Sequence, residues 1–154
     1  MITYRICKRK FQKDLSGNGA AISGGRWNTK GFHMIYTSES RALCVTEIAV
    51  HIPLGIIPKD YALVQFQIHS TIKIYEVKEQ TLPAEWNEFP FHNLTQKLGD
   101  EFLKANRYAV MKVPSAVVQG EFNYLLNPAH DEFKKIVLLN TEPFNFDKRL
   151  FKRL

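Results

Sequence analysis

Glu47 is the acidic residue whose setting most suggests chemistry in this sequence. It falls in a segment with a helical pattern, where residues three and four positions away share its face. These neighbours are the apolar Leu43, Cys44 and Val50, together with His51. The carboxylate should therefore point toward the protein, where acidic side chains are seldom found without a partner. A catalytic carboxylate and a structural ion pair both fit this pattern.

Arg26 is the second candidate, and it lies in the glycine-rich segment Asp14–Gly31. The string Ser23–Asn28 reads Ser-Gly-Gly-Arg-Trp-Asn. Exposed backbone N–H groups beside a planar, permanently charged guanidinium suit the binding of phosphate or carboxylate. The segment lacks the Gly-Lys-Ser/Thr of a P-loop and the third glycine of a dinucleotide fingerprint. The alternative is a loop arginine stacked on Trp27.

Three further polar residues carry weaker signals. Tyr36 ends a predicted strand directly before the helix of Glu47. Ser115 follows the end of another strand, but no G-x-S-x-G elbow surrounds it, so nothing local marks it as a nucleophile. Asn123 begins a run that predicts a strand followed by a turn, in which asparagine is a common turn former.

Metal binding is not predicted. The 5 histidines show neither H-E-x-x-H nor a close paired spacing, and adding Cys7 and Cys44 gives no zinc pattern. The 2 cysteines cannot form a disulfide framework, and reduced thiols fit a cytoplasmic protein.

The elements that must position these residues predict an α+β fold. Strands are expected over Ile2–Cys7, Phe32–Tyr36, Tyr61–Ile68, Thr71–Val77, Tyr108–Val113, Glu121–Leu126 and Lys135–Leu139. One helix should run from a cap at Thr37 or Ser38 to about His51, and another from Asn93 to Asn106. The segments 14–31 and 82–93 read as irregular connections. Because strands mostly follow one another without a helix between them, we expect a mostly antiparallel sheet.

Composition predicts one globular domain over residues 1–154. The chain is 45% hydrophobic and 23% charged, which is ordinary for a folded domain. Its net charge is +6, with the basic excess in Arg5–Lys13 and Lys148–Arg153, a weak preference for an anionic partner. No apolar stretch follows the N-terminal charges, so no signal peptide is expected. The most apolar window, Ile48–Ile57, is broken by proline and glycine and predicts no membrane span.

The motifs form a specific set when they are taken together. They are, in order, Tyr4-Arg5-Ile6, Ser16-Gly17-x-Gly19-Ala20, Gly24-Gly25-Arg26-Trp27-Asn28, Tyr36-Thr37-Ser38, Glu47-Ile48-Ala49-Val50-His51, Leu82-Pro83-x-x-Trp86, Leu98-Gly99-Asp100, Val113-Pro114-Ser115-Ala116, Asn123-Tyr124-Leu125-Leu126-Asn127-Pro128 and Phe146-Asp147-x-Arg149-Leu150. This set resembles the RES domain family, which is named for an Arg, a Glu and a Ser. The resemblance extends from Tyr4 to Leu150.

The resemblance implies a bacterial toxin of the RES–Xre toxin–antitoxin type. Such toxins use or deplete NAD, and their fold is similar to that of ADP-ribosyltransferases. The family's catalytic Arg, Tyr, Glu and Ser fall on Arg26, Tyr36, Glu47 and Ser115. We expect the NAD-binding residues to be Gly25, Arg26, Trp27, Asn28, Tyr36 and Asn123.

The expected partner is an Xre-type antitoxin with a helix-turn-helix domain, whose C-terminal part blocks the toxin's cleft. DNA binding then belongs to the antitoxin, and neither nucleic acid nor membrane is expected to bind this chain directly. A homodimer and a toxin–antitoxin hetero-oligomer are both compatible with the sequence.

These residues support a hypothesis for NAD cleavage. Glu47 would stabilise positive charge developing on the ribose, and Arg26 would hold the phosphates with N–H groups of the glycine loop. Tyr36 would pack on nicotinamide or ribose, and Ser115 would fix a substrate hydroxyl or orient Glu47. Water or phosphate is the favoured acceptor, with a protein side chain as the alternative. An alternative of another class is a non-enzymatic module that binds nucleic acid or protein, in which Glu47 and Arg26 form a structural pair.

Overall fold

The computed structural model describes residues 1–90 and 93–151, and in this part of the chain seven strands form one sheet in the order β4-β5-β6-β2-β1-β3-β7. The strands are β1 (Ile2–Lys8), β2 (Ile35–Ser38), β3 (Tyr61–Ile68), β4 (Ile74–Glu76), β5 (Val110–Pro114), β6 (Phe122–Leu126) and β7 (Ile136–Phe144). Neighbouring strands are antiparallel except for the β4–β5 pair, which is parallel. The prediction of an α+β fold with a mostly antiparallel sheet is confirmed.

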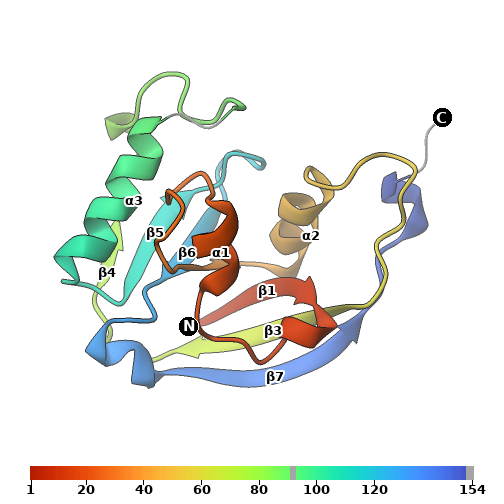
Figure 1. Cartoon of the computed structure of the whole chain (residues 1–154), viewed down its shortest axis with the longest axis horizontal. Coiled ribbons are helices and arrows are strands. Elements are labelled where there is room, and N and C mark those ends of the chain that lie inside the picture. The colour runs from red at the N-terminus through yellow and green to blue at the C-terminus, as the bar shows by residue number, and fades with distance from the viewer. Residues whose placement is uncertain (91–92, 152–154) are drawn as a thin grey trace.

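Helices lie over the sheet and at its β4 end. They are α1 (Asn18–Ser23), α2 (Arg41–Ala49) and α3 (Asn93–Ala105), with short 3-10 turns η1 (Arg9–Phe11), η2 (Glu79–Thr81), η3 (Asp131–Lys135) and η4 (Lys148–Phe151). Figure 1 shows α1 and α2 above β1, and α3 beside β4 and β5. The glycine-rich segment that was predicted to be irregular therefore contains a short helix.

The junction between β2 and α2 differs from the prediction. The strand covers Ile35–Ser38 instead of Phe32–Tyr36. Thr37 donates its hydroxyl hydrogen to the carbonyl oxygen of Tyr124, so it serves the sheet and does not cap the helix. Ser40 is the N-cap, and its side chain accepts a hydrogen bond from the backbone N–H of Leu43. The predicted cap at Thr37 or Ser38 is wrong because both residues belong to the strand.

Pairing also sets the length of the outer strands. β7 runs to Phe144, beyond the predicted end at Leu139, because it pairs with β3 from Ile68 opposite Ile136 to Tyr61 opposite Phe144. β4 is shorter than the predicted Thr71–Val77, since it pairs with β5 only over Ile74–Glu76.

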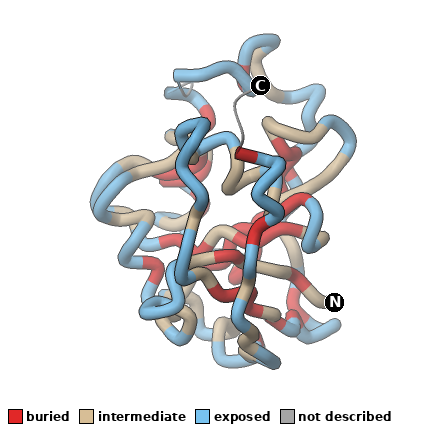
Figure 2. The backbone as a smooth tube through the Cα atoms, turned by 90° about the vertical axis from the view of Figure 1, so that its right-hand side faces the viewer, coloured by how far each residue is buried: buried red, intermediate tan, exposed pale blue. Residues whose placement is uncertain are grey.

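The sheet has two halves, one formed by β4, β5, β6 and β2 and the other by β1, β3 and β7. The core lies between these halves and beneath the helices. One cluster joins strands of both halves and includes Ile35, Val64, Phe66, Val110 and Leu126. A second lies under α3 and includes Trp27, Trp86, Phe102, Met111 and Leu125. A third lies under α2 and includes Ile6, Cys44, Leu63, Phe146 and Phe151. Figure 2 shows these buried segments gathered in the middle of the molecule.

The sheet nearly divides between β1 and β2. These strands are in register at one position, Tyr4 opposite Ser38. In contrast, β1 pairs with β3 along its whole length, from Ile2 opposite Gln67 to Lys8 opposite Tyr61. Away from the Tyr4–Ser38 pair, β1 and β2 are not paired. Residues of both strands line a cavity at this division of the sheet.

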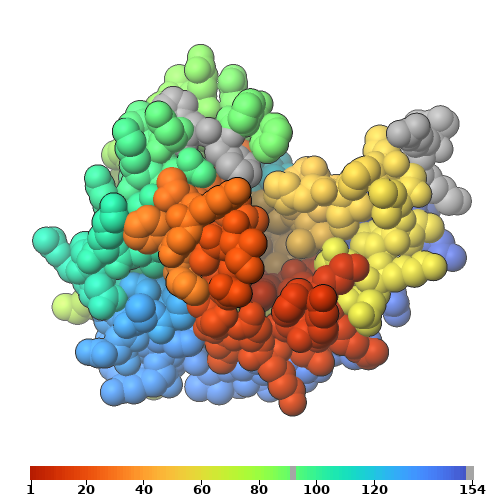
Figure 3. Space-filling model, viewed as in Figure 1, coloured from red at the N-terminus to blue at the C-terminus, as the bar shows by residue number. Residues whose placement is uncertain are grey.

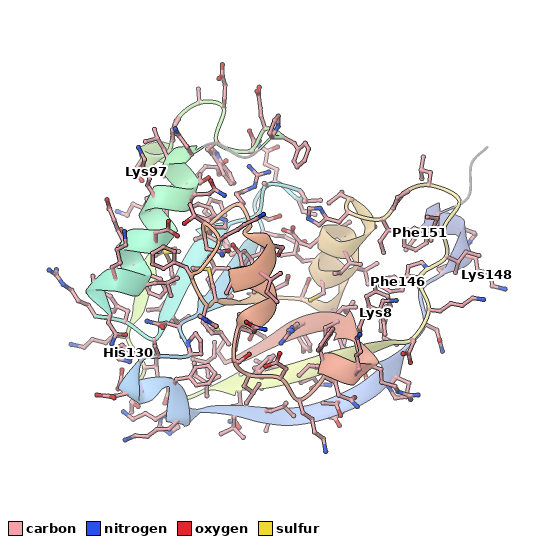
Figure 4. All side chains as sticks on the ribbon, in the orientation of Figure 1. Lys8, Lys97, His130, Phe146, Lys148 and Phe151 are labelled. Atoms are coloured by element: carbon pink, nitrogen blue, oxygen red, sulfur yellow. The ribbon has the colours of Figure 1, made fainter. Side chains whose placement is uncertain are left out.

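The two basic ends of the chain lie on the same side of the molecule. The ammonium group of Lys8 lies 4.4 Å from the ring centre of Tyr61. Tyr61 contacts Phe146 edge to face at 5.4 Å, and Phe146 contacts Phe151 at 5.6 Å. Figure 4 shows Phe146 and Phe151 at the same end of the molecule as Lys8 and Lys148. Within residues 1–90 and 93–151, no helix has both the length and the apolar character needed to cross a membrane.

Candidate active site

A cavity of about 1060 Å³ opens over the division between β1 and β2. Figure 3 shows the hollow between α1, α2 and the end of β1. Its size suits a small-molecule site. Most of the residues that the sequence predicted to act together line it: Gly25, Arg26, Trp27, Tyr36, Glu47 and Asn123.

Glu47 is held in the cavity wall by one of its two carboxylate oxygens. Oε1 accepts hydrogen bonds from Ser115 Oγ at 2.8 Å and from Asn123 Nδ2 at 2.6 Å. Across the described residues, 1–90 and 93–151, no donor reaches Oε2. The carboxylate is thus fixed in position while one oxygen keeps its full capacity to accept hydrogen bonds.

The hydroxyl of Ser115 is fully engaged. Ser115 directly follows β5, is only 5% exposed, and is not among the residues that line the cavity. Its Oγ accepts hydrogen bonds from the backbone N–H groups of Val117 at 3.1 Å and Val118 at 3.0 Å. Since both lone pairs of the oxygen are used, its hydrogen is directed to Glu47.

The orientation of the Asn123 amide is also determined by its partners. Asn123 lies opposite Ser38 in the β2–β6 register, and its Oδ1 accepts a hydrogen bond from Ser38 Oγ at 2.7 Å. The Nδ2 group must therefore face Glu47. Sequence reasoning expected Asn123 to bind NAD, and the structure places it both in the cavity wall and against the carboxylate.

Arg26 faces the same cavity and contacts the segment after η2. Its Nη1 donates to the carbonyl oxygens of Trp86 at 2.6 Å and Glu88 at 3.0 Å. Burial lowers the pKa of the Arg26 guanidinium, and the negative charge of Glu47 acts in the opposite direction. Arg26 and Glu47 are therefore near enough to interact electrostatically.

Tyr36 and Asn28 hold the arginine loop from behind. The Tyr36 hydroxyl donates to Asn28 Oδ1 at 2.7 Å and accepts a hydrogen bond from the backbone N–H of Trp27 at 3.1 Å. Burial raises the pKa of this phenol well above its ordinary range, so it stays protonated. Asn28 is 0% exposed and is absent from the cavity lining; its Nδ2 donates to the carbonyl oxygen of Ala20 at 2.9 Å. Asn28 was expected to bind NAD, but it lies behind the wall.

Arg5 was missed as a site residue. It lines the cavity from β1, and its Nη1 donates to the carbonyl oxygen of Asp14 at 2.9 Å. The signal was a charged residue in the middle of the predicted strand Ile2–Cys7. Nowhere in the described ranges do three or more His, Cys, Asp or Glu side chains gather as a metal site requires.

Comparison with known proteins identifies relatives over nearly the whole chain. The RES domain profile matches residues 2–147. A "Prs ADP-ribosylating toxin" of Sphingobium sp. (strain YBL2) is 34% identical over 142 residues, which are 91% of this chain and 88% of that protein. A "Toxin Res" of Photorhabdus laumondii is 34% identical over 155 residues, which are 99% of this chain and 98% of that protein.

The fold recurs in a solved toxin. The crystal structure of the M. tuberculosis MbcT–MbcA toxin–antitoxin complex contains a chain that matches with a TM-score of 0.75 at 19% identity, covering 97% of this chain and 86% of that one.

Proposed function

Because the chain belongs to the RES domain family, we propose that it is the toxin of a toxin–antitoxin system and that it cleaves the bond between nicotinamide and ribose in NAD. The observation that carries the proposal is the shared cavity, which places a guanidinium, Arg26, and a carboxylate, Glu47, around one volume of about 1060 Å³. NAD offers a pyrophosphate for the first group and a ribose that becomes positively charged for the second.

Glu47 acts at the ribose. When the C1′–N bond breaks, nicotinamide leaves as a neutral ring with the bonding electron pair, and positive charge develops on C1′ and the ring oxygen. The carboxylate stabilises this oxocarbenium-like state, and its Oε2 accepts a hydrogen bond from a ribose hydroxyl. Water then attacks this carbon and releases a proton to the solvent, which gives ADP-ribose. Inorganic phosphate as acceptor gives ADP-ribose phosphorylated at the same carbon.

Arg26 and Arg5 bind the pyrophosphate from two walls of the cavity. Both guanidinium groups are permanently charged and planar, which suits paired hydrogen bonds to phosphate oxygens. Gly25 and Trp27 flank Arg26 in the wall, and the ring of Tyr36 packs on the nicotinamide or the ribose. The Tyr36 hydroxyl takes no part in proton transfer, because it is committed to Asn28 and the Trp27 N–H group.

Ser115 and Asn123 orient Glu47. Each donates one hydrogen bond to the same carboxylate oxygen, and each is held by a further contact of its own. Ser115 is therefore assigned as a positioning residue and not as a covalent nucleophile. Because these donors are already oriented before the substrate arrives, they need no reorganisation when charge develops in the transition state.

The decisive test is incubation of the purified protein with NAD, with separation of nicotinamide by liquid chromatography. We expect nicotinamide release by the parent and its loss in Glu47→Gln, which keeps the side-chain shape and removes the charge. Adding inorganic phosphate and analysing the ribose product separates a hydrolase from a phosphorylase. Unchanged NAD with the folded parent protein would contradict the proposal.

A protein acceptor is the second candidate. It is favoured by the relative in Sphingobium, which is named a Prs ADP-ribosylating toxin. The first step is the same, and a nucleophilic side chain of the target replaces water at C1′. Labelled NAD added to a bacterial lysate distinguishes the two, since transfer leaves the label on protein and hydrolysis leaves it in free ADP-ribose.

We further propose an Xre-type antitoxin as the partner and the cytoplasm as the site of action. Support comes from the relatives named Toxin Res and from the likeness in fold to a chain of a toxin–antitoxin complex. Co-expression with the neighbouring gene should suppress toxicity, and the two products should purify together.

A further inference from the structure

We propose that α3 positions the arginine loop through Gln96 and Asp100, and that these two residues set the affinity for the pyrophosphate without touching it. This inference deepens the proposed function and rests on it. The loop consists of residues 25–29, and Arg26 lines the cavity from it.

Gln96 holds both ends of the turn that carries Arg26. The backbone N–H of Gly25 donates to the carbonyl oxygen of Asn28 at 2.9 Å, which closes the turn around Arg26 and Trp27. The Nε2 group of Gln96 donates to the carbonyl oxygens of the same two residues, Gly25 at 2.9 Å and Asn28 at 3.3 Å. One amide thus bridges the residues on either side of the arginine.

Asp100 holds Thr29, the residue that directly follows the turn. Its Oδ1 accepts a hydrogen bond from the backbone N–H of Thr29 at 2.9 Å, and its Oδ2 accepts one from Thr29 Oγ1 at 2.7 Å. Asp100 is only 7% exposed. A buried carboxylate needs such charge-assisted hydrogen bonds, and they are stronger than those between neutral groups. Thr29 is therefore held firmly by both its backbone and its side chain.

Gly99 brings the helix into direct contact with the loop. A Cβ at this position would lie 1.7 Å from the carbonyl oxygen of Trp27. Because Gly99 and Asp100 lie three and four positions after Gln96, both share its face of α3. Lys97 and Glu101 are exposed, and Figure 4 shows Lys97 on the outer side of the helix.

The loop is thus held on two sides, by α3 and by Tyr36. Such support fixes the backbone beneath Arg26 before a ligand binds, so less ordering is needed on binding. Loss of the support should weaken recognition of the pyrophosphate, which Arg26 provides. It should leave the bond-breaking step nearly unchanged, because Glu47 is held by other residues.

The test uses Gln96→Met, which removes the amide with little change in volume, and Lys97→Met as the matched control on the neighbouring exposed position. The probe is ADP-ribose, which carries the pyrophosphate and no nicotinamide, and its dissociation constant is measured by calorimetry. We expect Gln96→Met to weaken ADP-ribose about threefold to tenfold, the effect of losing a neutral hydrogen bond. The KM for NAD should rise in parallel, kcat should change less than twofold, and Lys97→Met should match the parent.

A double variant shows whether the effect passes through Arg26. In an Arg26→Ala background, Gln96→Met should weaken ADP-ribose no further, because the group it positions is gone. The Asp100 contact is tested independently through the Thr29 hydroxyl that bonds to it. Thr29→Val, which removes the hydroxyl, should weaken ADP-ribose binding, and Thr29→Ser, which keeps it, should bind ADP-ribose like the parent.

Two failures can be told apart. The positioning role alone would be overturned if Gln96→Met and Thr29→Val bound ADP-ribose as tightly as an active parent. It would also be overturned if these substitutions weakened ADP-ribose binding by the same factor with and without Arg26. A folded parent that neither binds ADP-ribose nor releases nicotinamide would overturn the proposed function and this inference with it.

Discussion

Ser115 donates its hydroxyl hydrogen to Glu47 Oε1 over 2.8 Å, although 68 positions separate the two residues along the chain. The contact exists because β5 ends next to α2, and Val117 and Val118 fill the remaining capacity of the serine oxygen. Glu47 and Ser115 are therefore directly coupled, because the serine hydroxyl holds one oxygen of the carboxylate in place.

Replacing Ser115 with alanine should reduce catalysis more than binding. Oε1 then keeps only the Asn123 hydrogen bond, and loss of a hydrogen bond to a charged group corresponds to a fall of about tenfold to a hundredfold in kcat. The KM for NAD should change little. Steady-state kinetics measure both, and a complete loss of activity in a folded Ser115→Ala protein would favour a covalent role instead.

Replacing Asn123 with aspartate should make activity depend on pH. The new carboxyl group lies about where Nδ2 lies, 2.6 Å from Glu47 Oε1, and two carboxylates at that distance cannot both ionise easily. At low pH the shared proton replaces the lost N–H donor, and activity is retained. As the pH rises through the raised pKa of the pair, the second charge repels Glu47 and activity falls. A pH profile of kcat that parallels the parent would contradict this arrangement.

Arg26→Lys should raise the KM for NAD about tenfold or more, since an ammonium group cannot make the paired hydrogen bonds of a guanidinium. It should also loosen the segment after η2, because Arg26 Nη1 bonds to the carbonyl oxygens of both Trp86 and Glu88. Kinetics give the first effect, and the rate of proteolysis at residues 82–90 gives the second. Unchanged KM would remove Arg26 from the substrate site.

Gly99→Ala should destabilise the fold. The added methyl group meets the Trp27 carbonyl oxygen at 1.7 Å, so α3 and the loop must move apart, at a cost of about 1–3 kcal/mol or more. Gly19→Ala is the matched control, because a Cβ there meets nothing within 4 Å and alanine favours the helix by about 1 kcal/mol. Urea unfolding of both variants measures the change in the free energy of unfolding. Equal midpoints for the two variants would show that α3 and the loop are not in close contact at Gly99.

Cys44 should make stability fall at alkaline pH. Burial raises the pKa of its thiol from about 9 to about 11. The unfolded chain loses this proton first, so the contribution is fully present below about pH 9 and declines as the pH rises toward 11. Cys44→Ala should show a smaller loss of unfolding free energy between pH 8 and pH 10.5 than the parent. An identical loss in both proteins would remove Cys44 as a cause.

The sequence predicted the seven strands and two of the three α-helices, α2 and α3, and it indicated which residues could do chemistry, but it did not predict α1. The apolar Leu43 and Cys44, one turn before Glu47, predicted the inward direction of this carboxylate, and both are buried, whereas Val50 on the next turn is exposed. Two adjacent glycines marked Arg26 as an anion-binding candidate. These are local properties, since neighbours in a helix or a turn are neighbours in the chain.

Only the tertiary structure decided which groups meet. Asn28 and Asn123 look alike as loop or strand-end asparagines, but one is buried behind the wall and the other bonds to Glu47. Arg5, Gln96 and Asp100 reach the site or its loop from distant elements. The physical reason is that strand register and helix packing bring together residues far apart in the chain, so contacts between them cannot be read from local spacing.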